Sequence, residues 1–459
     1  MKRLLLIVVL LALGSVPVQA LETAWVVTTD YSSFGRIRAM GGAAPWTVSA
    51  DLVTIPGDAV ARHHAGLIYV VGRGGANLVQ VYNPAASFAL VREFSLGAGF
   101  NLQDIAFDTA GEAYVSCYDQ ALLLRVDVAS ETILASYSTA AYADSDGLPE
   151  TSWMRAVGDK LYITCQKLDR NNWYAPSGPG QLLVFDMASE GFEAPIDLIG
   201  ADPYTQIETV PGGIGGVDLR VGCAGYFGLA DGGIETIDRT AGLSLGYDAT
   251  EAELGGDVTA FATAGDALYV LISDASFITS LRRYDLVTGA VTVVATGTGY
   301  VHADVVFDGG SQLVVADRTS GASGLRVYDA NSGAELTTGA LPTGLPPFMI
   351  VLPEADIAAP VPPQFSTGGL AVGSPFPNPC NPRAEMVLTG RSGATVGLTV
   401  FDLRGHRVCE DTRVLDAGGQ AIWAFQGVDF RGRNLPAGVY RVVAQSGTGY
   451  AARSITLIK

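Results

Sequence analysis

Ten side chains that could bind a ligand or a metal ion lie beside short apolar runs in the first two-thirds of this 459-residue chain. They are Arg62, His63, Gln103, Asp104, Trp153, Arg155, Asp218, Asp257, His302 and Asp304. Five further aspartates follow other apolar runs, namely Asp30, Asp119, Asp231, Asp274 and Asp317. Carboxylates that converge on one point could bind Ca²⁺, which prefers six to eight oxygen ligands. The alternative is turn chemistry, in which each aspartate accepts hydrogen bonds from its own loop.

Motifs of several enzyme classes are absent from the sequence. The chain has no Gly-x-Ser-x-Gly elbow, no His-Glu-x-x-His and no phosphate-binding Gly-x-x-x-x-Gly-Lys. It contains four His and five Cys, and none of their spacings resembles a zinc site. Asp144-Ser145-Asp146-Gly147 is half of a calcium-loop pattern. We therefore assign no catalytic residue from the sequence and leave a calcium site open.

The elements that must position these side chains recur along the chain. The middle residues of seven apolar triplets are 43, 45, 48, 64, 43 and 44 positions apart. These residues are Val26, Tyr69, Tyr114, Tyr162, Tyr226, Tyr269 and Leu313. A period in the forties, built from short apolar runs separated by Gly and Asp, is typical of a β-propeller with one four-stranded blade per repeat. We expect an all-β, seven-bladed propeller over residues 21–355, with six or eight blades as alternatives, and tyrosines packed between blades.

The first repeat lacks an inner strand, because the chain enters at Ala24–Thr29, a segment equivalent to the second strand of the other repeats. Phe348–Val351 is an unassigned apolar segment after the seventh repeat. We predict that it completes the first blade and closes the ring, which would leave no open sheet edge. Asp or Asn at the end of each third strand is predicted to start a turn by accepting backbone N–H bonds.

In such a propeller, the loops that enter each first strand and the loops after each second strand share one face. The first set of ten side chains is therefore expected near the central channel, with the five further aspartates around it. Two long insertions, 166–180 and 191–216, carry Trp173, Tyr174 and Tyr204 among polar residues. Exposed aromatic side chains on loops are candidates for contact with carbohydrate or protein.

The start of the chain has the pattern of a signal peptide. Lys2 and Arg3 precede the apolar run Leu4–Leu13, and Val18-Gln19-Ala20 resembles a signal-peptidase site. About ten apolar residues are too few to cross a hydrocarbon core, which takes about 20. We expect cleavage after residue 20, no transmembrane segment in the mature chain, and a secreted protein or one at the outer cell surface.

Charge divides the chain into two modules. Residues 21–355 contain 16 basic and 39 acidic side chains, a net charge of −23, whereas residues 356–459 contain ten basic and seven acidic side chains, a net charge of +3. The total of −18 argues against nucleic acid as a partner. Prolines are frequent in residues 356–374, which we interpret as an extended linker to a second domain over residues 375–459.

Five cysteines are few for an exported chain, and an odd number leaves at least one unpaired. Cys117 and Cys165 occupy the same repeat position and are interpreted as buried thiols on neighbouring blades. Cys380 and Cys409 lie in the second domain and could form a disulfide.

The second domain has alternating strands typical of a small β-sandwich. They are Glu385–Leu388, Val396–Asp402, Ala421–Gln426, Gly438–Gln445 and Ala451–Ile458. Three motifs and the chain end resemble the Ig-like module of type IX secretion sorting domains and of flagellar hook-capping proteins. The matching positions include Pro377, Asn378, Pro379, Asn381, Pro382, Asp402, Gly405, Pro436, Gly438 and Tyr440, while Cys380 replaces the usual Phe. The resemblance implies a role in sorting or attachment through export machinery or the cell surface.

The propeller repeats, for example Ile105–Val115 and Val305–Asp317, resemble NHL-type surface propellers. That likeness is shared with protein-binding families and with gluconolactonase-like hydrolases. We therefore predict an exported binding propeller that recognises an unknown protein, glycan or small molecule. A metal-dependent, lactonase-like hydrolase that uses channel carboxylates is the alternative.

Overall fold

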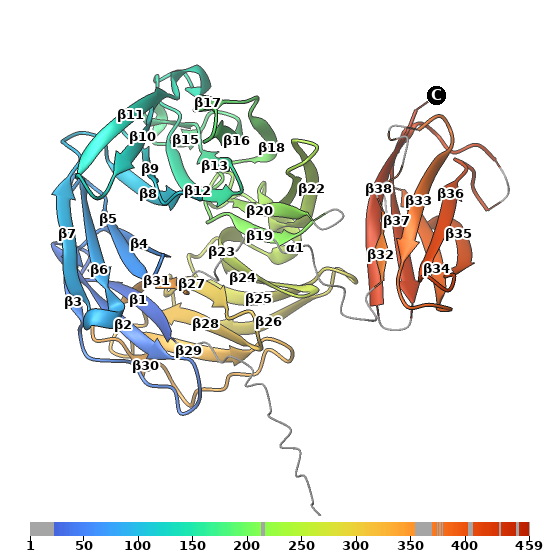
Figure 1. Ribbon diagram of the computed structural model, residues 1–459. Helices are drawn as coiled ribbons and strands as arrows, with labels where there is room; N and C mark the ends of the chain where they lie inside the picture. Colours follow the sequence, from blue (N-terminus) through green and yellow to red (C-terminus); the bar gives the residue numbers. More distant parts are fainter. Residues whose placement is uncertain are drawn as a thin grey trace, which may run out of the picture.

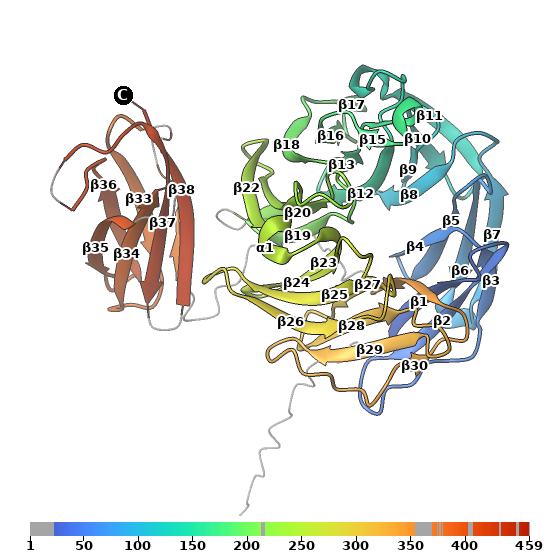
Figure 2. The same ribbon diagram turned by 180° about the vertical axis from the view of Figure 1, so that it is seen from behind.

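The computed structural model describes residues 23–212, 216–353, 370–373, 375, 378, 380–402, 407–430, 433–446 and 449–458. The strands before residue 353 form seven antiparallel sheets arranged in a ring (Figure 1). The same ring is seen from behind in Figure 2. The strands after residue 370 form two further sheets. The chain is therefore an all-β protein with a seven-bladed propeller, as predicted.

The first four blades run from inner to outer strand as follows. Blade 1 contains β31 (Pro347–Val351), β1 (Thr23–Thr29), β2 (Phe34–Gly41) and β3 (Val53–Pro56). Blade 2 contains β4 (Ala59–His64), β5 (Leu67–Gly72), β6 (Leu78–Asn83) and β7 (Ala89–Ser95). Blade 3 contains β8 (Leu102–Phe107), β9 (Ala113–Cys117), β10 (Leu122–Asp127) and β11 (Thr132–Ser138). Blade 4 contains β12 (Thr151–Val157), β13 (Lys160–Cys165), β16 (Pro179–Asp186), β17 (Gly191–Phe192) and β18 (Ile196–Ala201).

The other three blades have four strands each. Blade 5 contains β19 (Glu208–Pro211), β20 (Val217–Cys223), β21 (Gly233–Asp238) and β22 (Leu243–Thr250). Blade 6 contains β23 (Asp257–Ala264), β24 (Ala267–Ser273), β25 (Thr279–Asp285) and β26 (Val291–Thr296). Blade 7 contains β27 (His302–Phe307), β28 (Gln312–Asp317), β29 (Gly324–Asp329) and β30 (Leu341–Pro342). A short hairpin, β14 (Leu168–Asp169) and β15 (Ala175–Pro176), lies in the insertion of blade 4.

Helix is nearly absent from the described residues, as predicted from the sequence. The helical segments are α1 (Glu251–Leu254) and three 3₁₀ turns at Pro84–Ala86, Ala140–Tyr142 and Arg170–Asn172. None of the described helices has the length and apolar character that a bilayer crossing requires.

The ring closes as predicted, with the end of the propeller chain pairing with its beginning. Strand β31 pairs antiparallel with β1, with Trp25 opposite Val351 and Val27 opposite Met349. The backbone N–H of Thr29 also donates to the carbonyl oxygen of Pro346 at 3.0 Å. Blade 1 is thus shared between the two ends of the propeller chain.

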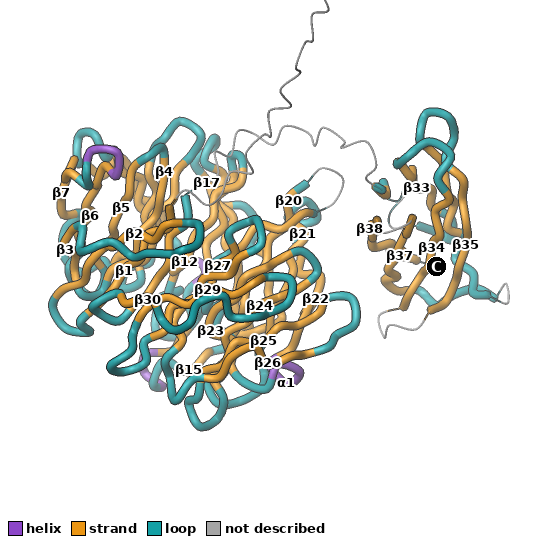
Figure 3. The backbone as a smooth tube through the Cα atoms, turned by 90° about the horizontal axis from the view of Figure 1, so that it is seen from below, coloured by secondary structure: helices purple, strands orange, loops and turns teal. Residues whose placement is uncertain are grey.

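Two families of loops follow from this topology. Because strands alternate in direction, the loops after second strands and after fourth strands emerge on one face, which we call the aromatic face. The hairpin turns after first and third strands emerge on the opposite face, which we call the turn face. Figure 3 shows the propeller edge-on, with α1 and β15 of the aromatic face at the lower side.

The predicted turn chemistry is present at the ends of third strands. The Oδ1 atom of Asp285 accepts the backbone N–H groups of Val287 and Thr288 at 3.1 and 2.9 Å. Four other aspartates accept the N–H groups of the residues two or three positions later in the same way: Asp127, Asp186, Asp238 and Asp329. These carboxylates hold the turn face by short-range contacts.

The predicted tyrosine position is correct in four blades and wrong in blade 5. Four rings are buried between blades: Tyr69, Tyr114, Tyr162 and Tyr269. Tyr226 instead lies in the loop after β20 and is 43% exposed. The strand register puts buried Arg220 at the equivalent position, where its Nε lies 2.8 Å from Asp248. An arginine that replaces the tyrosine explains why the spacing of 64 residues was irregular.

The cysteines of the described residues are unpaired. Cys117 and Cys165 are fully buried in β9 and β13 of neighbouring blades, and burial raises their pKa values to about 12. The prediction of buried thiols is confirmed for them. Cys380 and Cys409 are also free thiols, so the disulfide that the sequence would allow between them does not form.

The second domain is a β-sandwich of two antiparallel sheets. One contains β32 (Ala371–Val372), β33 (Ala384–Thr389) and β36 (Gln420–Phe425). The other contains β35 (Arg407–Val414), β34 (Thr395–Asp402), β37 (Gly438–Ser446) and β38 (Gly449–Leu457). The prediction missed β35 and β32. Trp423, Phe425 and Tyr440 are buried in the shared core, so this domain has a core of its own.

The motif residues of the sandwich have structural contacts where they are described. The Oδ1 atom of Asn378 accepts the N–H of Thr456 at 2.8 Å, and Cys380 is bonded through its backbone to Thr456 and Ile458. The Tyr440 hydroxyl donates to the carbonyl of Pro436 at 2.7 Å. Pro377, Pro379 and Gly405 lie outside the described residues, as do the predicted signal peptide (1–20) and most of the linker.

Candidate functional site

The inner strands of the seven blades surround a central channel of about 1140 Å³. Six of the ten predicted binding residues line it: Arg62, His63, Gln103, Trp153, Arg155 and Asp304. The repeat pattern predicted the positions of these six residues correctly, because each of them lies in the first strand of its blade. The other four predicted residues do not line the channel, and each has a structural position instead.

Asp104 lies fully buried between blades 2, 3 and 4, not on the channel surface. Its carboxylate forms a bidentate ion pair with Arg62, with N–O distances of 2.8 and 2.7 Å. It also accepts the N–H groups of Ile105 and, from blade 4, Met154, at 2.9 and 2.8 Å. The bonds to Arg62 and Met154 cross blade boundaries. The carboxylate therefore acts as a clamp, by which we mean a group that joins neighbouring blades.

Arg62 reaches across the channel from blade 2. Its Nη1 donates to Oε1 of Gln206, just before blade 5, at 2.5 Å, and its guanidinium lies 5.3 Å from the ring centre of Trp153 in blade 4. One arginine therefore contacts blades 2 to 5. This bridge fixes the shape of the channel wall.

Asp304 repeats the clamp of Asp104 at the closure of the ring. Its carboxylate accepts the N–H of Val305 at 2.9 Å and the N–H of Ile350 in the closing strand β31 at 2.8 Å. Burial raises its pKa to about 7, while the two N–H bonds oppose that rise. Because the two aspartates follow the same pattern, we interpret both as clamps between neighbouring blades, with Asp304 at the ring closure.

Three further predictions of channel residues were wrong. Asp257 is buried beneath the loop after β20 and accepts the N–H of Gly228. His302 is buried beside Thr279, with 3.3 Å between Nδ1 and Oγ1, and burial lowers its pKa. Asp218 stands at the start of β20, at the turn-face end of blade 5. Asp218 was misplaced because blade 5 lacks the tyrosine that anchored the repeat alignment, whereas Asp257 and His302 begin the inner strands of blades 6 and 7 and are buried there.

The channel lining also includes residues that were not predicted from the sequence, among them Glu208 and two groups at the aromatic-face mouth, Tyr300 and Arg318. Glu208 starts β19 and accepts the N–H of Thr263, at 3.1 Å from Oε2. Burial raises its pKa, and Arg220 and Arg155 oppose that rise. A corrected register for blade 5 would have indicated Glu208, because it pairs with Arg220 at the tyrosine position.

Aromatic side chains gather on the aromatic face. Every aromatic side chain that is exposed among the described propeller residues belongs to its loops: Tyr31, Trp173, Tyr174, Tyr204, Tyr226, Phe227, Phe277 and Tyr300. Trp173 is 95% exposed, so it makes almost no contact with the rest of the protein. The sequence prediction that the two insertions expose aromatic residues is confirmed for Trp173, Tyr174 and Tyr204.

Many of these aromatic residues contact one another across loops. The rings of Tyr204 and Phe227 lie edge to face with centroids 6.1 Å apart. The Tyr226 hydroxyl donates to the carbonyl of Pro176 in the neighbouring insertion at 3.0 Å. The aromatic face is thus a connected surface around the channel mouth.

The five further aspartates lie on the aromatic face, and the described contacts are those of turn chemistry. Asp30 and Asp274 accept N–H groups within their own loops, and Asp231 accepts the N–H of Tyr226. Asp317 binds Thr319 and pairs with Arg326 at 2.6 Å. Asp119 pairs with Arg170 at 2.8 Å.

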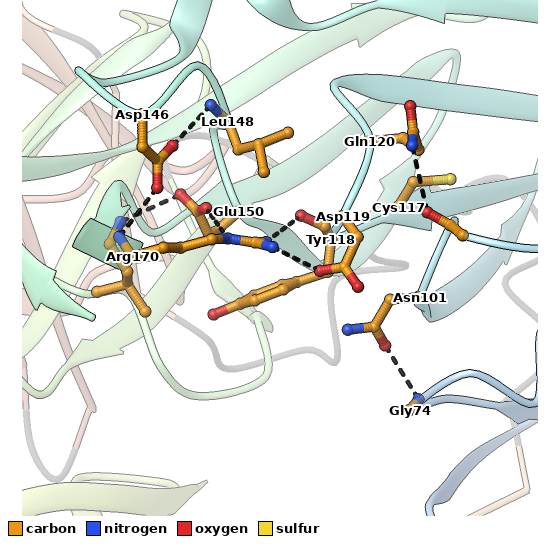
Figure 4. Close-up of polar contacts among 12 residues, drawn as sticks. Gly74, Asn101, Cys117, Tyr118, Asp119, Gln120, Asp146, Leu148, Glu150 and Arg170 are labelled. Atoms are coloured by element: carbon orange, nitrogen blue, oxygen red, sulfur yellow. Dashed lines mark hydrogen bonds and ion pairs between the residues drawn. The ribbon is translucent and has the colours of Figure 1, made fainter. Parts of the chain in front are cut away.

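Among the described residues, one acidic trio comes close enough to hold a metal ion, and it lies outside the channel. Its members are Asp144, Asp146 and Glu150, in the half calcium-loop pattern. Arg170 contacts the trio through its Nε, 3.0 Å from Glu150, and through its backbone N–H, 2.9 Å from Asp146 (Figure 4). Burial raises the pKa of Glu150 to about 7. Arg170 thus places a positive charge beside the acidic trio.

Comparison with other proteins identifies no family for this chain. No family model matches it, and no curated protein matches it by sequence. Solved structures of bacterial proteins with a similar arrangement of strands do exist, all at low sequence identity to this chain.

PorZ, an essential bacterial surface component of the type IX secretion system of Porphyromonas gingivalis, has a TM-score of 0.43 and 15% identity, over 93% of this chain and 64% of PorZ. AztD from Citrobacter koseri has a TM-score of 0.44 and 12% identity, over 72% of this chain and 97% of AztD. A functionally unknown protein from Desulfotomaculum acetoxidans has a TM-score of 0.48 and 12% identity, over 72% of this chain and 98% of that protein. The chain therefore spans less than two-thirds of the length of PorZ.

Proposed function

We propose that this protein is an exported or surface-displayed binding protein whose aromatic face recognises an extracellular ligand and whose C-terminal sandwich serves sorting or attachment. The observation that carries the proposal is the gathering of exposed aromatic side chains on one face, around the channel mouth. Aromatic residues on loops over a rigid scaffold are frequent in binding surfaces and dominate their energetics. Signal-peptide and sorting-module patterns in the sequence support the exported location.

Binding can be tested with a glycan microarray and three purified full-length proteins. The proteins are the wild type, the double variant Trp173→Ala/Tyr174→Ala, and Val287→Ala on the turn face as control. Trp173 is 95% and Val287 68% exposed, so neither change should affect folding. We expect a glycan class that the wild type and the control retain and the double variant loses. Equal binding by all three proteins, or by none, would contradict the proposal.

Sorting can be tested by transfer of the sandwich. Residues 366–459, fused behind a signal peptide and a reporter, should carry the reporter to the surface or medium of a host with type IX secretion machinery. Residues 21–355 behind the same signal peptide should remain in the periplasm. The sandwich has a hydrophobic core of its own, which supports its use as a separate module. Equal export of both fusions would leave the sandwich as a spacer.

A metal-dependent hydrolase is the second candidate, favoured by Glu208 and Asp304, two of the four carboxylates that line the channel with Asp58 and Asp202. Among the described residues, no three of these four carboxylates lie close enough together to share one metal ion, whereas a lactonase-like metal centre needs three or four oxygen ligands. Metal analysis of the purified protein discriminates between the candidates. A stoichiometric metal ion that is lost in a Glu208→Gln variant, together with lactone hydrolysis, would replace the binding proposal.

A further inference from the structure

Arg318 occupies a distinct position at the mouth of the channel on the aromatic face. It follows β28, and its backbone N–H donates to the carbonyl of Val301 at 2.7 Å, which fixes the start of its loop. Its guanidinium carbon lies 5.4 Å from the ring centre of Tyr300 and 5.9 Å from that of Tyr31. Tyr31 belongs to the loop after the second strand of blade 1, and Tyr300 belongs to the loop that joins blades 6 and 7, so the cation lies between blades at the mouth.

No described acidic group pairs with this guanidinium. Its Nε atom is buried without a hydrogen-bond partner among the described residues. The adjacent Asp317 is occupied by Arg326 at 2.6 Å and by Thr319. Two other arginines of the same face differ, because Arg73 pairs with Asp58 at 2.7 Å and Arg170 pairs with Glu150 and Asp119. Arg318 thus has donors left for a ligand.

The chemistry of a guanidinium in this setting favours a carboxylate. Its planar fork of N–H donors matches the two oxygens of a carboxylate, and charge-assisted bonds of this kind are about twice as strong as neutral ones. The aromatic rings keep water from part of the cation, which strengthens the attraction. The propeller as a whole carries a charge of −23, so general attraction cannot account for binding of an anion there.

The surroundings of Arg318 fit a sugar ring better than an extended peptide. Aromatic rings alternate with polar groups at the mouth, where Tyr300 lies beside the Arg318 guanidinium and the carbonyl of Tyr204 accepts Nε1–H of Trp153 at 2.8 Å. A second recess of about 220 Å³ lies beside Tyr31 and Phe348. Flat apolar surfaces next to hydrogen-bonding groups suit the two characters of a saccharide, and the mouth is concave.

We propose that Arg318, with Tyr31 and Tyr300, binds the carboxylate of an acidic saccharide at the channel mouth. This inference rests on the proposed function and names the class of its ligand. The saccharide chain would lie over the aromatic face, with one uronic acid residue at Arg318. The chemical requirement is a carboxylate on a sugar ring, not negative charge alone.

The test is calorimetric titration of the full-length protein with oligogalacturonate and with its methyl ester, which keeps the sugar ring and removes the charge. We expect the acid to bind at least tenfold more tightly than the ester. Arg318→Gln should weaken the acid at least tenfold and leave the ester unchanged, because a charge-assisted bond is lost. Arg282→Gln is the matched control, since its Nε is bonded to Ser280 in β25, away from the mouth.

Several results would overturn the inference. One is equal affinity of the wild type and Arg318→Gln for the acid. A second is equal, Arg318-dependent binding of dextran sulfate, which would reduce the site to general anion binding. A third is binding of poly-glutamate with the same dependence on Arg318 and no binding of acidic saccharides, which would indicate a protein partner.

The outcome also separates this inference from the proposed function. If Trp173→Ala/Tyr174→Ala abolishes binding of a neutral glycan while Arg318→Gln has no effect, the aromatic face is a binding surface and the carboxylate site is wrong. If the double variant has no effect on any ligand and Arg318→Gln still weakens the acid, the mouth binds an anion without the wider aromatic face.

Discussion

The two faces of the propeller are held in different ways. On the turn face, an aspartate at the end of a third strand binds the backbone of the two or three residues that follow it, as in Asp285 and Asp329. On the aromatic face, Asp30 and Asp274 form turns of the same kind, but other loops are held by buried carboxylates from further along the chain. Glu251 accepts the N–H groups of Gly232 and Val258, and Asp257 accepts that of Gly228.

The difference extends to the electrostatics of the carboxylates. The Lys160 ammonium and backbone N–H groups lower the pKa of Asp186 on the turn face to about 2. Burial raises the pKa of Glu251 to about 8 and that of Asp202 to about 6 on the aromatic face. The turn-face loops described above are therefore stabilised by contacts within each loop. The aromatic-face loops held by Glu251 and Asp257 depend instead on the packed blades beneath them. The exposed aromatic side chains of that face are therefore positioned by the packed blades beneath them.

The largest effect should come from breaking the ring that supports both faces. Deletion of residues 346–459 removes β31, leaves β1 unpaired and takes away the Ile350 N–H that Asp304 binds. We expect loss of cooperative unfolding in calorimetry and broad proteolysis. Deletion of residues 366–459 is the control and should keep the propeller transition. Equal melting temperatures for the two truncations would contradict ring closure.

A smaller but clear effect is expected from the interblade clamp. Asp104→Ala leaves Arg62 without its carboxylate and the Met154 N–H without its acceptor, and breaking a buried pair of this kind costs about 3–5 kcal/mol. Asp329→Ala on the turn face should change the melting temperature much less, because that carboxylate bonds only within its own turn. Chemical denaturation of the two variants measures the difference. Comparable losses would mean that the faces are supported equally.

Much of the propeller could be predicted from the sequence because its determinants are periodic. Alternating apolar residues, Gly turns and the repeated Asp at third-strand ends gave the blade count, and the missing inner strand pointed to Phe348–Val351. The same logic failed in blade 5, where Arg220 replaces the tyrosine and pairs with Asp248. A buried ion pair can substitute for a ring in the core, and apolar periodicity does not detect it.

The candidate site was only partly predictable, since a repeat gives the strand of a side chain and not its direction. Asp104 and Asp304 follow the same pattern as channel-facing residues, yet both turn into the blade boundary to bind N–H groups of the next blade. Arg318 carries no motif at all. Its aromatic setting consists of Tyr300, from the loop that enters the same blade, and of Tyr31 from blade 1, which the closed ring brings beside it.

The opposite pKa shifts of Glu251 and Asp186 predict how their contributions to stability depend on pH. For Glu251, the folded-state pKa of about 8 lies above the ordinary 4.5, so the folded protein binds the proton more tightly between these values. Its contribution is complete below pH 4.5 and is lost as the pH rises through 8. Asp186 has the opposite sign, since its contribution is present above pH 3.8 and is lost as the pH falls through 2. The combined contribution of these two groups should be largest between the pH range in which the contribution of Asp186 is lost and the range in which that of Glu251 is lost.

Melting temperatures at pH 5.5, 7.0 and 8.5 check this expectation. The wild type should melt a few degrees lower at pH 8.5 than at pH 5.5. Glu251→Gln keeps an acceptor for the two N–H groups and should flatten part of that decline. Glu131→Gln, at an exposed glutamate 3.8 Å from Arg92, is the control and should follow the wild type. An unchanged slope in Glu251→Gln would assign the pH dependence to other groups.

The smallest effect concerns the coupling between two aromatic-face loops. The Tyr226 hydroxyl bonds to the carbonyl of Pro176, so Tyr226→Phe removes one contact between the loop after β20 and the insertion that carries Trp173. A single hydrogen bond contributes about 1 kcal/mol, and this one is partly exposed. The melting temperature should stay constant, while amide exchange should accelerate in residues 166–178. Phe277→Leu, on a separate loop, should leave that exchange unchanged. If Tyr226→Phe also leaves it unchanged, the aromatic face consists of independent loops, and each ring must be positioned by its own blade.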